Sequence, residues 1–89
     1  MYVNFFTATV EVLTKFSNQP VPFASVFTTG ANPRFLGETD ANGRLTFSID
    51  RNEEIIVTKT GFVLESVVVR GCTNIDVILR VNINLSNLL

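Results

Sequence analysis

Apolar and polar residues alternate with a period of two in short runs that recur about every ten residues along the chain. In the run from 7 to 16, for example, Val10 and Val12 share one face with Glu11 between them. This alternation is typical of β-strands with one buried face, and no window shows the three-and-four spacing of an amphipathic helix. β-branched residues and Phe dominate the runs, which also favours strands.

The residues from 40 to 43, Asp-Ala-Asn-Gly, predict the clearest hairpin in the chain. They join a short strand at 35–39 to a run in which Leu45, Phe47 and Ile49 alternate with polar residues. Asn and Gly tolerate the positive φ of a tight turn, and the Asp40 carboxylate can accept hydrogen bonds from backbone amides within it.

Further strands are expected at 23–29, 54–60, 67–69 and 75–79, which gives about seven strands (six to eight) and no helix. Short strands at this spacing are typical of a sandwich. The sequence therefore predicts an all-β fold, a single seven-stranded antiparallel β-sandwich, with residues 1–89 as one domain.

The last ten residues, 80–89, continue the alternation through Val81, Ile83 and Leu85. A free tail is rarely this apolar. The segment is expected to form either an extra edge strand of the same sheet or an arm that docks on a neighbouring subunit by strand addition.

Alternation also assigns the two faces of each strand. The expected core comprises Ala24, Val26, Leu45, Phe47, Ile49, Ile55, Val57, Val67, Val69, Val77 and Leu79. The same period then directs Phe23, Phe27, Ile56, Val68 and Ile78 outward.

Five large outward-facing apolar side chains are more than an ordinary surface carries. We interpret them, together with Val81, Ile83 and Leu85, as a candidate protein interface with Phe23 and Phe27 at its centre, since buried aromatics dominate interfaces. A bulge that shifts the register would instead bury part of this set, as would cover by the N-terminal apolar segment or by the C-terminal strand.

Three stretches together resemble the carboxypeptidase regulatory-like domain, a transthyretin-like β-sandwich of the broader Ig-like kind, over residues 9–79. The stretch 20–26, Pro-Val-Pro-Phe-Ala-Ser-Val, resembles its Pro and Ala-Ser-Val signature, with Phe23 where Gly is usual. The stretch 39–47 resembles its Thr-Asp-x-x-Gly turn, and Gly61-Phe62 resembles its later Gly-aromatic pair. The resemblance implies a free-standing accessory sandwich, because the domain carries no catalytic residues in that family.

Composition narrows the possible partners. Hydrophobic residues make up 46% of the chain and charged residues 17%, against about 25% charged in an average soluble domain. A partner protein is therefore expected to cover part of the surface. With a net charge of −1 and no run of like charges, neither nucleic acid nor an anionic membrane is an expected ligand.

Neither a secretion signal nor an apolar run of 18 residues is recognisable in the sequence. Cys72 is the single cysteine, so an intrachain disulfide cannot form. The chain is therefore expected in a cytoplasm or in a particle assembled there.

The residue types present favour a non-catalytic protein that needs no cofactor or metal. The chain contains no His, which removes the usual base and the commonest transition-metal ligand. Cys72 is interpreted as a structural or incidental thiol. Residues 40–43 resemble the start of a calcium loop, but Arg44 and Arg51 stand where ligands are needed. Glu53 and Glu54 would point to opposite faces of a strand and cannot converge.

By elimination, the sequence favours a structural assembly protein. Its concrete form would be an auxiliary or decoration protein on a bacteriophage capsid, located in the virion, with the capsid, another large assembly or copies of itself as partner. The alternative is a free-standing module for adhesion that binds a carbohydrate or a cell-surface protein through loops 28–34 and 50–53.

Overall fold

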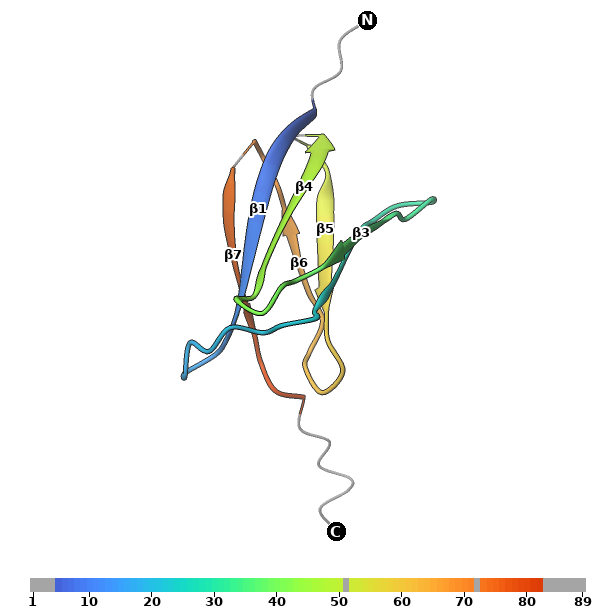
Figure 1. Cartoon of the computed structure of the whole chain (residues 1–89). Coiled ribbons are helices and arrows are strands. Elements are labelled where there is room, and N and C mark those ends of the chain that lie inside the picture. Colours follow the sequence, from blue (N-terminus) through green and yellow to red (C-terminus); the bar gives the residue numbers. More distant parts are fainter. Residues whose placement is uncertain (1–4, 51, 72, 83–89) are drawn as a thin grey trace, which may run out of the picture.

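The computed structural model describes residues 5–50, 52–71 and 73–82, which form seven strands and no helix. The strands are β1 (Phe5–Thr14), β2 (Ser25–Thr28), β3 (Phe35–Glu38), β4 (Arg44–Asp50), β5 (Glu54–Thr58), β6 (Glu65–Val68) and β7 (Asn74–Leu79). They pack as a three-stranded sheet, β4-β1-β7, against a four-stranded sheet, β3-β2-β5-β6 (Figure 1). The predicted all-β sandwich of seven strands is confirmed.

Strand direction departs from the prediction at one place. All pairs are antiparallel among the described strands except β1 and β7, which run parallel with Thr9 opposite Asn74 and Thr14 opposite Leu79. The pairing joins the first described strand to the last, so no short turn has to connect them. Alternation within each strand does not record this direction, because it is the same in either orientation.

The predicted hairpin at 40–43 is wrong, although its turn forms as expected. The amides of Asn42 and Arg44 both donate to Asp40 Oδ1, at 2.9 and 3.0 Å, and Gly43 has a φ of 76°. The strands on either side then separate, because β3 pairs with β2 and β4 pairs with β1. Turn residues determine the local chain reversal, whereas burial on both sheets determines the strand partners.

The core lies between the two sheets and agrees with the predicted set. All its predicted members are buried except Leu45 and Val67, which are partly buried and pack against it. Further buried apolar residues are Ala8, Val10, Val12, Val21 and Ile75. The strand positions that alternate with these core residues therefore face outward from each sheet.

After β7, the chain crosses toward the loop between β5 and β6. Val63 N donates to Arg80 O and Asn82 N donates to Gly61 O, each at 2.8 Å, around a bridge between Phe62 and Val81. Residues 83–89, with Ile83 and Leu85, lie outside the described residues. The choice between an edge strand and a docking arm therefore stays a prediction.

Candidate functional site

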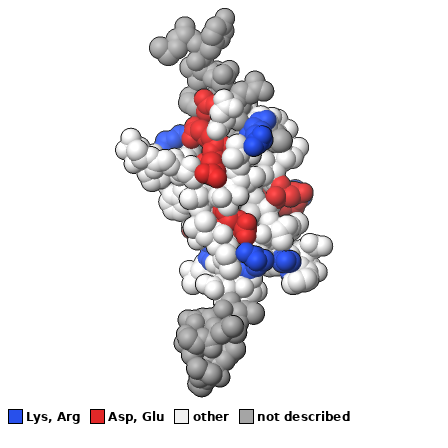
Figure 2. Space-filling view, turned by 180° about the vertical axis from the view of Figure 1, so that it is seen from behind, with Lys and Arg blue, Asp and Glu red and all other residues white. Residues whose placement is uncertain are grey.

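Four of the five outward-facing apolar residues lie on the same side of the molecule. We call the outward side chains of the four-stranded sheet the four-strand face: Ser25, Phe27, Phe35, Glu38, Glu54, Ile56, Thr58, Ser66 and Val68. Phe27, Ile56 and Val68 belong to it, and Phe23 lies at its edge beside Ser25 and Thr58. Figure 2 views the molecule from this side, where most of the described surface is white and the charged side chains form small patches.

A row of apolar side chains crosses the middle of the four-strand face. Phe35 is opposite Phe27, and Phe27 is opposite Ile56, so the three lie side by side on β3, β2 and β5. The rings of Phe27 and Phe35 are 5.3 Å apart between centroids and tilted by 53°. Phe27 and Ile56 are partly buried by their neighbours, whereas Phe35 remains 58% exposed.

Val68 extends this apolar surface on β6. It is opposite Glu54, one row from Ile56, and Ser66 occupies the position opposite Ile56. Diagonal neighbours on one face of a sheet are within reach of large side chains. Val68 is 39% exposed, so the outward position expected from alternation is confirmed.

Phe35 was not identified from the sequence because a bulge interrupts the alternation. Val26 is opposite Gly37 whereas Phe27 is opposite Phe35, so Leu36 is the extra residue on β3. Leu36 packs against the core and Phe35 remains outside beside Phe27. The signal in the sequence was Gly37 inside a short strand, since an isolated Gly there is typical of a bulge.

Phe23 has an unusual backbone conformation for an aromatic residue. Its φ is 59° and its side chain is 62% exposed, with Lys59 Nζ 5.6 Å from the ring centroid. The left-handed region costs a non-Gly residue about 1–2 kcal/mol. This explains why Gly would suit the position, and it shows that Phe here carries a cost in stability without burying the ring.

A buried threonine holds this strained segment in place. Thr39 Oγ1 accepts a hydrogen bond from Ala24 N at 2.9 Å and donates to Val21 O at 2.6 Å. Phe23 N also donates to Thr39 O at 2.9 Å. Residues on both sides of Phe23 are therefore fixed to the end of β3, which determines where the exposed ring projects.

Phe23 forms one wall of a shallow hollow at the edge of the four-strand face. The other lining residues are Ser25, Glu38, Thr58, Lys59 and Thr60. The hollow therefore places an exposed aromatic ring next to hydroxyl groups and one group of each charge.

Ile78 and Val81 do not join this surface. Ile78 is 40% exposed on β7, opposite Leu13 of β1, and therefore lies on the three-stranded sheet. Val81 is 63% exposed and shares a hollow with Lys15, Phe16 and Arg80. The structure therefore divides the predicted interface residues between separate places.

Two exposed apolar residues outside the strands were also missed. Phe16 is 94% exposed with a φ of 74°, and Leu64 is 52% exposed. Neither has a signal in the sequence, because alternation says nothing of positions in loops.

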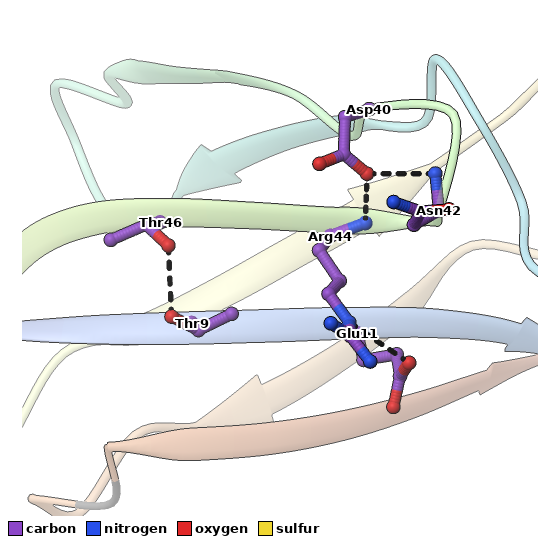
Figure 3. Close-up of polar contacts among 6 residues, drawn as sticks. All are labelled: Thr9, Glu11, Asp40, Asn42, Arg44 and Thr46. Carbon is purple, nitrogen blue, oxygen red and sulfur yellow. Dashed lines mark hydrogen bonds and ion pairs between the residues drawn. The ribbon is translucent and has the colours of Figure 1, made fainter.

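The outward side chains of the three-stranded sheet are mainly polar and bond to one another. Thr9 and Thr46 hydroxyls are 2.8 Å apart across β1 and β4, and Arg44 Nε donates to Glu11 Oε2 at 3.2 Å (Figure 3). Arg44 begins β4 directly after the turn that Asp40 organises. We call this surface the three-strand face, and it also includes Asn74 and Asp76.

The residues that the sequence suggested for metal binding or catalysis either bond to other groups of the chain or lie outside the described residues. Asp40 accepts two turn amides, and Glu53 Oε1 is 3.4 Å from Arg34 Nη2. Among residues 5–50, 52–71 and 73–82, no three His, Cys, Asp or Glu side chains gather as metal ligands would. Cys72 and Arg51 lie outside the described residues. Within the described ranges, no helix is both long and apolar enough to cross a membrane.

Comparison with known proteins gives little further information. No family model and no curated protein matches the chain. Among solved structures, 88% of the chain is similar to 16% of a 9R-lipoxygenase from Cyanothece PCC8801, with a TM-score of 0.48 and 18% sequence identity. The chain thus spans a small part of that protein's length.

Proposed function

We propose that the chain is a non-catalytic structural module that attaches to a larger protein assembly through the four-strand face. The observation that carries this proposal is the row Phe35-Phe27-Ile56, with Val68 and the exposed Phe23 beside it. Exposed aromatic groups on a flat, preformed surface are typical of interface centres. The small share of charged residues supports the same proposal.

The concrete form of the proposal is an auxiliary protein that decorates a bacteriophage capsid. The virion is then its location, and the capsid or neighbouring copies of the chain are its partners, with assembly in the host cytoplasm. A sandwich of this size with a row of apolar side chains across one outer face suits a part that is present in many copies and is covered by neighbours. The resemblance to the carboxypeptidase regulatory-like domain, also a proposal, agrees with an accessory role.

Density-gradient sedimentation of the native source tests the proposal, with quantitative mass spectrometry of this chain in each fraction. Co-migration with a multi-megadalton particle at a fixed copy number is the expected result. Recovery of the chain only as a species near its own mass of 9.9 kDa would contradict it.

The hollow beside Phe23 favours a second candidate, a module that binds a carbohydrate. An aromatic ring can stack on a sugar while Ser25, Thr58, Thr60, Glu38 and Lys59 supply hydrogen-bonding groups. In this case the contacts come from the hollow rather than from loops 28–34 and 50–53.

A glycan array probed with the wild-type chain and with Phe23→Ala distinguishes this candidate. Binding to a defined glycan that Phe23→Ala removes and Phe35→Ala retains would support it, because Phe35 lies outside the hollow. If the wild-type chain binds no glycan on the array, the carbohydrate-binding candidate is excluded and protein attachment is favoured.

A further inference from the structure

We propose that the four-strand face packs on the same face of a second copy of this chain, with the two-fold axis lying along the row Phe35-Phe27-Ile56. This inference rests on the proposed function, since it names an occupant for the same surface. In a two-fold interface, each group meets the partner position related by the axis, so the surface has to be complementary to itself.

The central row satisfies this condition on the axis. Its three residues are register partners on β3, β2 and β5, so they form a line across the strands. Rotation about that line places Phe27 against its own equivalent, and likewise Phe35 and Ile56. Two such rows form an apolar centre, and face-to-face sheets about 10 Å apart pack their side chains in this manner.

The charged groups on β5 are complementary across the same axis. Glu54 lies two residues to one side of Ile56 and Lys59 lies three residues to the other, about 7 and 10 Å along the strand. The rotation therefore brings Glu54 of each copy toward Lys59 of the other. Lys59 lines the hollow together with the outward residues Ser25 and Thr58, which places its side chain on this face.

The neighbouring strand β6 is also complementary across this axis. Val68 lies to one side of the row, and the exposed Leu64, directly before β6, lies to the other. The axis thus pairs an anion with a cation at β5 and an apolar residue with an apolar residue at β6.

The size of the face indicates a weak dimer. Four strands about 4.8 Å apart and about five residues of 3.4 Å each give a footprint of roughly 300 Å². A standard stable interface buries about 800 Å² on each partner. Self-association in the micromolar range or weaker is therefore expected, which suits a contact repeated many times in an assembly.

Sedimentation equilibrium of the purified chain, taken to about 1 mM because of the small interface, tests the inference. The expected result is a concentration-dependent rise from 9.9 kDa to twice this mass. Glu54→Lys and Lys59→Glu each place like charges opposite one another across the axis. Each variant alone is expected to weaken association roughly fivefold to tenfold.

An equimolar mixture of the two variants is the decisive sample. The lysine introduced at position 54 of one chain then meets the glutamate introduced at position 59 of the other, and the two native charges meet at the second contact. Heterodimers are therefore expected to form as well as the wild-type dimer. Positions 54 and 59 of one chain are about 17 Å apart, which is beyond the screening length in physiological salt. Attraction between these two positions within one chain therefore cannot account for restored association in the mixture. Asp76→Lys, a similar charge reversal on the three-strand face, is the control and leaves association unchanged.

Three results would overturn the inference: a monomer at every concentration, a mixture that associates no better than its components, or an equal loss in the Asp76→Lys control. If the pure chain is monomeric but still migrates with a particle, the dimer fails and the proposed function stands. If it dimerises but never migrates with a particle, the proposed function fails instead.

Discussion

The two outer faces of the sandwich come from the same alternation but differ in how their side chains are satisfied. On the three-strand face, Thr9 bonds to Thr46 and Arg44 pairs with Glu11. On the four-strand face, the equivalent positions hold Phe27, Phe35 and Ile56. Polar side chains of the first face bond to one another, whereas the second exposes apolar surface whose burial would release free energy.

The difference extends to the backbone. The turn that leads into Arg44 uses Gly at its positive-φ position, Gly43, and Asp40 bonds its amides. The segment that leads into β2 places Phe23 at a φ of 59° and needs buried Thr39 to hold it. Strained residues persist where the surrounding structure determines them, and they gather at functional sites. The strain at Phe23 therefore agrees with the proposed attachment through the four-strand face, although Phe16, outside this face, also has a positive φ of 74°.

The same negative charge placed on each of the two faces should give the largest difference in attachment. Phe27→Asp puts a carboxylate in the central apolar row and is expected to reduce attachment to the native particle at least about a hundredfold. Thr46→Asp places the same group on the three-strand face and should leave attachment unchanged. Binding of each purified variant to stripped particles, measured by co-sedimentation, checks this.

Circular dichroism of the same variants gives the control for folding. Loss of the Phe27–Phe35 contact should cost about 1–2 kcal/mol of stability and leave a folded chain. An unfolded Phe27→Asp would place Phe27 in the core, and equal loss of attachment in both variants would remove the distinction between the faces.

Much of this comparison could be predicted from the sequence, because burial follows alternation. Val26 and Val57 were assigned to the core and Phe27 to the outside, and each is found there. Strand pairing could not be predicted, because the Asp40 turn has the chemistry of a hairpin yet joins different sheets. Phe35 was missed because the bulge at Leu36 shifts the phase, and the division of Ile78 from Phe27 depends on sheet membership, which alternation does not encode.

Substitution of Gly43 should produce the largest change in stability. A Cβ at this position would lie 2.6 Å from Val12 O, and its φ is 76°. Gly43→Ala is therefore expected to lower the free energy of unfolding by roughly 2–4 kcal/mol. Gly30→Ala is the matched control, since its φ is 103° and no atom lies within 4 Å of the added Cβ.

Urea denaturation of both glycine variants measures how much the close approach of position 43 to Val12 O changes the free energy of unfolding. In the Gly30→Ala control, the free energy of unfolding should fall only by the cost of an alanine at positive φ, about 1–2 kcal/mol. Equal losses would mean that the close approach to β1 contributes nothing. A larger loss at Gly43 would show that the close approach to Val12 of β1 leaves no room for a Cβ.

The strain at Phe23 predicts opposite effects on stability and attachment. Phe23→Gly removes about 1–2 kcal/mol of backbone strain, offset by about 0.4–1 kcal/mol from the greater freedom of Gly in the unfolded chain. Phe23→Ala loses the same ring but keeps most of the strain. Both variants should attach roughly tenfold more weakly, as expected for the loss of one exposed anchor.

Comparison of the two Phe23 variants isolates the free-energy cost of the positive φ at position 23. Chemical denaturation should show Phe23→Gly to be at least as stable as the wild-type chain, and Phe23→Ala to be less stable than Phe23→Gly. If the alanine variant is the more stable, the positive φ carries no strain. If both variants attach normally, Phe23 lies outside the interface.

The ion pair on the three-strand face should give the smallest effect. Arg44 and Glu11 have side chains that are 59% and 32% exposed, so solvent screens their attraction. Glu11→Gln and Arg44→Gln should each reduce stability by at most about 0.5 kcal/mol, and a double-mutant cycle should give a coupling of about 0.2–0.5 kcal/mol that disappears in 1 M salt. Attachment should not change in any of the three variants. A coupling that persists in high salt, or any loss of attachment, would mean that a partner covers this pair and that the three-strand face also takes part in assembly.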